Sequence, residues 1–325
     1  MKFYFAPMEG ITSYIFRNAY EKYYGGIDKY FSPFISPADH CAMNPKERRD
    51  ICPENNQGLT IVPQILANKP EHFIACTEIL QDMGYKEINL NLGCPSGTVV
   101  SKKKGSGFLT EYDALEDFLD AVYNYCEKAG ILLSVKTRIG RYDPMEWYDI
   151  IDIYNKFPIK ELIVHPRIRD DYYKGAPRIE FYKYAVENSK NPLVYNGNIY
   201  SVEDMRQYEK FFHEDPDIHN GNVEPVVMMG RGLLYNPELL MNYREAGMED
   251  RNRTPFDMNR FRGFHNDLYH GYQQIMAPDI HVIYHLKGLW LYWEELFPDN
   301  KKTVKKIIKC KKYTEYDALL RELGI

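Results

Sequence analysis

The sequence predicts an α/β protein built on a TIM (β/α)8 barrel, followed by a small all-α C-terminal domain. Short apolar segments alternate with amphipathic helical segments along about 240 residues, a pattern typical of parallel sheets with crossover helices. Eight strand segments occur, which is the number that closes a TIM barrel. No G-x-G-x-x-G motif follows the first strand, so a doubly wound open sheet is the less favoured alternative.

The elements are expected where apolar patterns end in turn residues. The predicted strands are Lys2–Ala6, Lys29–Ile35, Thr60–Leu66, Glu87–Leu92, Ile131–Lys136, Glu161–Val164, Leu193–Asn196 and Pro225–Met229. Helices are expected after Thr12 or Ser13 and then at Glu71–Met83, Asp113–Ala129, Pro144–Lys156, Ile179–Glu187 and Val202–Phe212. Beyond an Asn252–Pro255 linker only helices are predicted, at Met258–Ile275, Ile280–Leu296, Lys301–Lys312 and Glu315–Leu323. We therefore expect a barrel domain over residues 1–253 and a helical domain over residues 254–325.

The composition is that of a soluble globular protein. Of the 325 residues, 44% are hydrophobic and 27% are charged, and no apolar run approaches the length of a membrane span. The N-terminus lacks the pattern of a signal peptide, so we expect a cytoplasmic protein without membrane contact. The six cysteines form no C-x-x-C pair, and His40, Cys41 and Cys52 do not have the spacing of a recognised metal site. No metal is expected.

The stretch 88–109 carries the strongest chemical signal. A short apolar strand stops at Gly93 and delivers Cys94 into a loop rich in Gly, Ser and Lys, which is long enough to close over the thiol. A buried structural cysteine beside a turn is the alternative. The other strand ends favour the first interpretation, because active sites of TIM barrels lie at the C-terminal ends of the strands.

Polar residues occupy nearly every one of these predicted strand ends. The residues at these ends are Pro7, Met8, Glu9, Gln64, Asn91, Cys94, Lys136, Arg138, His165, Arg167, Asn196, Gly197, Asn198, Gly230 and Arg231. Gly197, Gly230 and Arg231 follow the last two strands, where TIM barrels commonly bind phosphate, although ordinary strand-ending turns would look similar.

Lys136 ends an apolar strand, so its ammonium is expected to be partly desolvated. It could form a Schiff base, as in barrel aldolases, or serve as a fixed positive charge beside a developing anion such as the N1/O2 edge of a reduced flavin. The second role is preferred, because Cys94 is a poor partner for an aldolase lysine. A thiol is mostly protonated at neutral pH and can give a proton to carbon.

Six motifs together resemble the flavin-dependent tRNA-dihydrouridine synthases. They are PMEGITSYIFR at 7–17, NLNLGCPSGTVVSKKKGSGFL at 89–109, VKTRIG at 135–140, VHPR at 164–167, NGN at 196–198 and MGRGLL at 229–234. The resemblance implies FMN in the barrel, reduced by NADPH. It further implies that hydride would pass from flavin N5 to C6 of a flipped-out uridine in tRNA, with Cys94 as the catalytic residue that protonates C5.

The resemblance also implies roles for the other strand-end residues. The cofactor would be bound by Pro7, Met8, Glu9, Gln64, Lys136, His165, Asn196, Gly197, Asn198, Gly230 and Arg231. The substrate would be contacted by Asn91, Arg138 and Arg167. The expected RNA surface consists of Lys287 and a run of lysines in segment 301–312, of which Lys302, Lys305, Lys306 and Lys309 are the candidates. A run of lysines is usually a solvated helix face, however. The segment around Lys287 is explained equally well by core packing.

Two other functions fit parts of this pattern. A dihydroorotate dehydrogenase-like FMN barrel would act on a free pyrimidine and would have no need of a basic helical domain. An RNA-binding protein that keeps the fold without catalysis is the second alternative. We expect a monomer.

Overall fold

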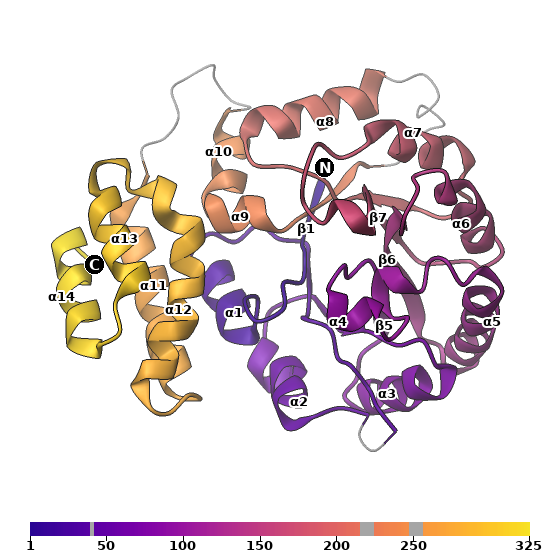
Figure 1. The fold of residues 1–325 in the computed structure, drawn as a ribbon, viewed down its shortest axis with the longest axis horizontal. Helices are drawn as coiled ribbons and strands as arrows, with labels where there is room; N and C mark the ends of the chain where they lie inside the picture. The colour runs from indigo at the N-terminus through magenta and orange to yellow at the C-terminus, as the bar shows by residue number, and fades with distance from the viewer. Residues whose placement is uncertain (40–41, 215–223, 247–255) are drawn as a thin grey trace. The chain divides into compact units, whose positions relative to one another are not determined.

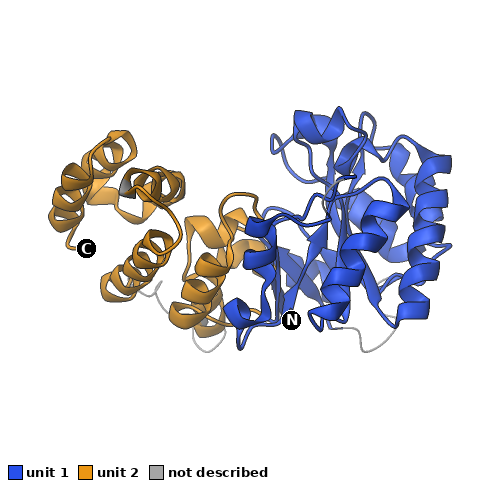
Figure 2. Ribbon diagram, turned by 90° about the horizontal axis from the view of Figure 1, so that it is seen from below, with its two compact units in different colours: residues 1–7, 28–198, 208–229 blue, residues 8–27, 199–207, 230–325 orange. Residues whose placement is uncertain are grey.

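The computed structural model describes residues 1–39, 42–214, 224–246 and 256–325, and the chain divides into two compact units (Figure 2). The first unit consists of residues 1–7, 28–198 and 208–229. The second consists of residues 8–27, 199–207 and 230–325, so it includes segments that the sequence assigns to the barrel. The predicted domain boundary between 253 and 254 lies outside the described residues.

The first unit is a parallel sheet with the strand order β3-β2-β1-β9-β8-β7-β6-β5-β4. Figure 1 labels β1, β5, β6 and β7 of this sheet. The strands are β1 (Lys2–Phe5), β2 (Lys29–Phe31), β3 (Ile61–Val62), β4 (Gln64–Ile65), β5 (Glu87–Leu92), β6 (Leu132–Gly140), β7 (Leu162–Ile168), β8 (Leu193–Tyr195) and β9 (Val226–Met229). The two strands at the ends of this order, β3 and β4, are consecutive in the chain. The sheet therefore closes on itself, and the predicted TIM barrel is confirmed.

Pro63 is the reason that one predicted strand appears as two. Proline has no N–H to give to a neighbouring strand. On one side of it β3 pairs with β2, and on the other side β4 pairs with β5. The Pro63 carbonyl still accepts a hydrogen bond from Asn89 N at 2.9 Å, so the barrel wall stays continuous at this point.

Helices surround the strands of this unit. They are α2 (Pro45–Ile51), α3 (Pro70–Asp82), α4 (Gly97–Val100), α5 (Tyr112–Ala129), α6 (Glu146–Tyr154) and α7 (Ile179–Asn188), while α8 (Val202–Glu214) begins in the second unit and ends in the first. The α2 helix was not predicted, although Asn44 and Glu47 form a capping box at its start. Short 3-10 turns lie at Pro53–Asn56, Gly105–Gly107 and Arg169–Asp171.

The middle of the barrel is apolar, and its N-terminal end is closed by an ion cluster. The apolar cluster consists of Tyr4, Ala6, Phe31, Val62, Ile163, Val194 and Met228. At the end where the strands begin, Lys29 Nζ lies 2.8 Å from Glu87 Oε2 and 2.9 Å from Glu161 Oε2, and all three side chains are largely buried. This end supports stability, which leaves the opposite end, here called the barrel mouth, for chemistry.

The second unit is helical. Its helices are α1 (Tyr14–Tyr23), α9 (Arg231–Tyr235), α10 (Leu239–Ala246), α11 (Met258–Gln273), α12 (Asp279–Trp293), α13 (Lys301–Lys309) and α14 (Tyr313–Leu323), with 3-10 turns at Glu294–Leu296 and Pro298–Asn300. Glycines bring α1 and α11 together. A Cβ on Gly263 would lie 2.4 Å from the Tyr23 ring, and one on Gly271 would lie 2.7 Å from Ile15. None of the described helices has the length and apolar character to cross a membrane.

Candidate active site

Cys94 is held at the end of β5 by the side chain of Asn91. The Asn91 Oδ1 atom accepts hydrogen bonds from the backbone N–H groups of Gly93, at 3.0 Å, and of Cys94, at 2.9 Å. An asparagine that bonds the backbone two and three residues ahead stabilises a turn. This turn takes the chain out of the strand and leaves the partly exposed Cys94 at the barrel mouth.

The glycine-rich loop folds back against Cys94. Ser106 donates to the Cys94 carbonyl through its hydroxyl, at 2.8 Å, and through its N–H, at 3.1 Å. Gly105 has φ +56°, and a Cβ there would lie 2.8 Å from Cys94 O. Only glycine fits this conformation and this approach without strain. The loop is therefore packed against the cysteine backbone, and Ser106 is a site residue that the sequence analysis did not identify.

Buried amide side chains form a hydrogen-bonded row inside the barrel next to Cys94. Gln64 Nε2 donates to Asn89 Oδ1 at 2.8 Å, and Asn91 Nδ2 donates to Gln64 Oε1 at 2.7 Å. Asn89 Nδ2 continues the row to Ser134 Oγ at 3.0 Å. The amide of Gln64 keeps one N–H and one lone pair for another partner. Asn89 was missed, although Asn89 and Asn91 stand two residues apart in a strand and so share a face.

Lys136 lies directly opposite Asn91 in the register of β5 and β6. Its pKa is lowered to about 7, mainly by desolvation and also by the nearby Arg138 guanidinium, while Cys94 acts in the opposite direction. Within the described residues its ammonium makes no hydrogen bond or ion pair. A desolvated ammonium without a partner, close enough to Cys94 to interact electrostatically, suits an anionic group bound at the mouth.

Arg138 connects the cysteine turn to the loop after β7. Its guanidinium donates to three backbone carbonyls, those of Gly93 at 3.0 Å, Ile168 at 2.8 Å and Tyr172 at 2.7 Å. Burial lowers its pKa to about 10. The guanidinium carbon of Arg138 lies 5.5 Å from the centroid of the Tyr173 ring. Arg138 therefore shapes the mouth by holding two loops in place.

Arg167 is fully buried and organises the end of β7. It donates to His165 Nε2 at 3.0 Å, to Asn198 Oδ1 at 3.2 Å, and to the Lys174 and Gly175 carbonyls at 3.3 and 2.5 Å. A guanidinium can only donate, so His165 Nε2 is the acceptor and its proton is on Nδ1. The structure thus brings His165, Arg167 and Asn198 together.

The other predicted cofactor residues fall in both units. Asn196 donates to the Met228 carbonyl at 2.8 Å, and Gly197 leaves no room for a Cβ beside the Tyr195 hydroxyl. Pro7 ends the first segment of the barrel unit, and the remaining four belong to the second unit: Met8, Glu9, Gly230 and Arg231. Within that unit Arg231 lies 5.5 Å from the centroid of the Tyr200 ring.

The predicted RNA-binding lysines divide into two groups. Lys302, Lys305, Lys306 and Lys309 are exposed on one side of α13, whereas Thr303, Val304 and Ile307 on its other side are buried. Lys305 also lies 3.3 Å from Glu294. Lys287 is different, because its ammonium donates to the Cys310 carbonyl at 2.6 Å and lies over the Tyr284 ring.

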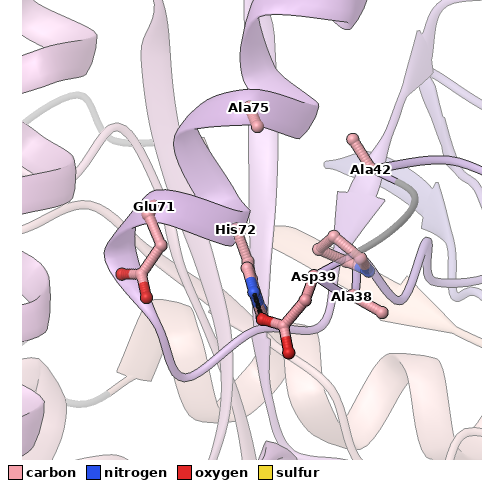
Figure 3. Close-up of a pocket in the computed structure, with 7 residues that line it drawn as sticks. Ala38, Asp39, Ala42, Glu71, His72 and Ala75 are labelled. Atoms are coloured by element: carbon pink, nitrogen blue, oxygen red, sulfur yellow. Dashed lines mark hydrogen bonds and ion pairs between the residues drawn. The ribbon is translucent and has the colours of Figure 1, made fainter.

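A separate surface pocket lies beside the start of α3 (Figure 3). It is lined by Pro37, Ala38, Asp39, Ala42, Glu71, His72 and Ala75. His72 Nε2 points at Asp39 Oδ1 and lies 2.7 Å from it (Figure 3). No cluster of His, Cys, Asp and Glu that could hold a metal ion is found in the part of the chain that the structure describes, which leaves out His40 and Cys41.

Fold and site together define an enzyme of the TIM-barrel class. Its thiol follows the end of β5. Its desolvated amine, which the sequence predicts at a strand end, lies within the neighbouring strand β6, because β6 continues to Gly140. The comparison with known families narrows this class. The family model for dihydrouridine synthase matches residues 4–312, and the chain therefore belongs to the dihydrouridine synthase family.

Individual relatives agree with that assignment. The chain is 27% identical over 281 residues to a probable tRNA-dihydrouridine synthase of Staphylococcus aureus strain COL, a match covering 84% of this chain and 78% of the relative. It is 26% identical over 281 residues to probable tRNA-dihydrouridine synthase 2 of Bacillus subtilis strain 168, covering 84% and 79%. A solved structure of a morphinone reductase mutant in complex with tetrahydroNAD superposes with a TM-score of 0.52 at 9% identity, covering 80% of this chain and 90% of that chain, and supports the barrel fold.

Proposed function

We propose that this protein is a tRNA-dihydrouridine synthase that reduces the C5–C6 double bond of a uridine in tRNA, with FMN as its cofactor and NADPH as the electron donor. The observation that carries the proposal is the placement of Cys94 beside Lys136 at the mouth of a barrel of this family. The names of the relatives support tRNA as the substrate.

The residues at the mouth fit a flavin. Lys136 offers an ammonium without a partner among the described residues, and Gln64 has one N–H and one lone pair left over. These groups suit the anionic, hydrogen-bonding pyrimidine edge of a reduced flavin. His165, Asn196, Gly197 and Asn198 at the next two strand ends, with Pro7, Met8, Glu9, Gly230 and Arg231, are the candidates for the rest of the cofactor. When bound and reduced, FMN supplies the hydride that C6 of the uridine receives.

Cys94 supplies the proton. Its S–H bond breaks as a C–H bond forms at C5 of the pyrimidine, and the thiolate then recovers a proton from solvent. The turn that Asn91 stabilises and the bond from Ser106 fix the cysteine backbone, so the thiol is positioned before the substrate arrives. The Lys136 ammonium is attracted to the Cys94 thiolate, which lowers the energy of the transient negative charge.

Basic residues support a polyanionic substrate. Lys102 and Lys103 are exposed on the same loop that packs against Cys94, and α13 exposes four more lysines. A uridine must leave the stacked bases to reach a thiol at the mouth, and phosphate contacts around it would position the RNA. We place Arg138 and Arg167 behind the substrate pocket, where they hold its loops.

The test is to map dihydrouridine in tRNA from cells with and without this protein, and then in an unmodified tRNA transcript incubated with the purified protein and NADPH. Dihydrouridine is expected at a defined position in both experiments. Turnover of a free pyrimidine with none in tRNA would favour the dihydroorotate dehydrogenase-like alternative. A protein that binds tRNA but cannot be loaded with FMN would favour the non-catalytic one.

A further inference from the structure

Two tyrosines are exposed on neighbouring loops at the barrel mouth. Tyr142 follows β6 and is 59% exposed, and Tyr172 follows β7 and is 41% exposed. Both strands end at the mouth, which is where TIM barrels meet their substrates. The loops touch, because Asp170 N donates to the Arg141 carbonyl at 3.3 Å. Large exposed aromatic rings at this end of the barrel are candidates for contact with a ligand.

Each of these rings lies against an arginine. The Arg141 guanidinium carbon lies 4.6 Å from the centroid of the Tyr142 ring, and that of Arg169 lies 4.9 Å from the Tyr172 centroid. Arg169 also interacts electrostatically with the Tyr142 hydroxyl, so the two stacks are adjacent. Because a guanidinium covers one face of each ring, the remaining exposed surface of the ring can stack against another flat group.

The two arginines differ in their partners. Arg169 is paired with Asp170 at 2.7 Å. The Arg141 guanidinium makes no hydrogen bond or ion pair within the described part of the chain, and its Nε is buried without a partner. No carboxylate of the described residues therefore pairs with Arg141, and several of its N–H donors remain available beside an exposed aromatic ring.

Both loops are held rigidly. The Glu146 carboxylate accepts three backbone N–H groups in succession, from Arg141 at 2.6 Å, Tyr142 at 3.0 Å and Asp143 at 3.1 Å. Tyr172 adopts φ +51°, which is uncommon for a non-glycine residue, and its carbonyl accepts from Arg138 at 2.7 Å. Because the backbone that carries the two rings is fixed in advance, less entropy is lost when a ligand stacks on them.

We propose that Tyr142 and Tyr172 form a stacking platform for unpaired bases of the RNA that flank the reduced uridine, with Arg141 bonding a neighbouring phosphate. This inference rests on the proposed function. Drawing one base out of the stack leaves its neighbours without a partner, and exposed aromatic rings replace that stacking whatever the base. A free guanidinium beside the rings supplies the contact to the backbone that single strands require. Arg138, which bonds both Tyr172 and Gly93, ties the platform to the cysteine turn.

The test uses the full-length flavoprotein and an unmodified tRNA transcript. Tyr142→Leu and Tyr172→Leu are each expected to weaken tRNA binding roughly five- to hundredfold, whereas Tyr142→Phe and Tyr172→Phe retain the ring and the affinity. Leu132 is exposed at the opposite end of β6, so Leu132→Ala is the control and should bind tRNA as the wild type does. Arg141→Gln should lower the salt dependence of binding by about one phosphate contact, and the tyrosine variants should leave that slope unchanged.

A second readout reports base stacking directly. 2-Aminopurine placed next to the target uridine should lose fluorescence when the wild-type protein binds, and the Phe variants should preserve this quenching. Leu variants that bind tRNA as tightly as the wild type, or an absence of quenching, would overturn the stacking platform. The proposed function would still stand in that case if the wild-type protein forms dihydrouridine. A wild-type protein that neither binds nor reduces tRNA would instead remove the proposed function, and the platform with it.

Discussion

Arg138 donates a hydrogen bond of 3.0 Å to the carbonyl oxygen of Gly93, the residue directly before Cys94. The same guanidinium bonds the carbonyls of Ile168 and Tyr172 in the loop after β7. One buried cation therefore links the turn that carries the thiol to the neighbouring loop at the mouth. Because its donors go to fixed backbone atoms, Arg138 acts as a positioning residue.

Replacing Arg138 should misplace the thiol without emptying the site. In Arg138→Lys, a single ammonium cannot reach three carbonyls in the geometry of the guanidinium, so we expect uridine reduction to slow by roughly a hundredfold. The rate constant for oxidation of the reduced flavin by tRNA is the measurement, with flavin content as the check on folding. Arg48→Lys, an exposed change on α2, is the control. An unchanged rate constant in Arg138→Lys would contradict the positioning role.

Two glycines of one loop provide a matched comparison. Gly105 has φ +56°, and a Cβ on it would lie 2.8 Å from Cys94 O, whereas a Cβ on Gly97 would have nothing within 4 Å. Gly105→Ala is expected to destabilise the protein by about 1–3 kcal/mol and to lower activity, while Gly97→Ala should be close to neutral. Thermal unfolding and turnover of both variants test this. Equal effects at the two positions would mean that the loop does not pack against Cys94.

Lys136 should make the stability of the flavin-free protein depend on pH. Its pKa is about 7 in the folded protein and ordinarily 10.5, so below pH 7 it is charged in both states and the fold carries the desolvation cost. As pH rises from 7 to 10.5 only the unfolded chain keeps the proton, and the free energy of unfolding therefore increases.

Lys136→Met lacks this titration. The difference in unfolding free energy between wild type and Lys136→Met should shift in favour of the wild type, by on the order of a few kcal/mol, between pH 7 and pH 10. Urea unfolding of both flavin-free proteins measures it. A difference that does not vary over this range would mean that the ammonium is well solvated.

The exposed lysines of α13 should contribute to RNA binding through charge alone. Changing Lys302, Lys305, Lys306 and Lys309 together to Ala is expected to flatten the dependence of tRNA affinity on salt. The control removes the same charge from four exposed lysines that precede strands β5 to β8, at the opposite end of the barrel from its mouth: Lys86, Lys128, Lys160 and Lys190. If both sets change the slope equally, α13 is only a solvated helix face.

The barrel could be predicted because its evidence is local. The alternation of short apolar segments with amphipathic segments predicts the strands and helices. Residues two apart in a strand lie on the same face, and Asn91 and Lys136 lie opposite each other on the interior face of β5 and β6. The contacts of Arg138 could not be predicted in this way. Its acceptors lie 30 to 45 positions away in the chain, and backbone carbonyls carry no sequence signal.

Other differences have equally specific causes. Pro63 divides a strand that its apolar neighbours predict as continuous, because the pattern does not register a missing N–H donor. The α2 helix had a recognisable signal in Asn44 and Glu47, and it was missed because its seven residues show no long apolar period. The second unit takes in α1 through the close approach of Gly263 to Tyr23, a tertiary contact that no local pattern contains.

We expect Cys94 to give a proton to the uridine held at the barrel mouth. The most direct measurement is a single turnover of the prereduced flavoprotein with tRNA, following both flavin oxidation and dihydrouridine. Cys94→Ala is expected to keep its flavin and to be reduced by NADPH as before, but to form dihydrouridine at least a hundredfold more slowly, roughly the lower range for loss of a general acid. Cys52→Ala, a change at a partly exposed cysteine elsewhere in the unit, should react as the wild type does. Dihydrouridine formed at the wild-type rate by Cys94→Ala would mean that Cys94 is not the proton donor.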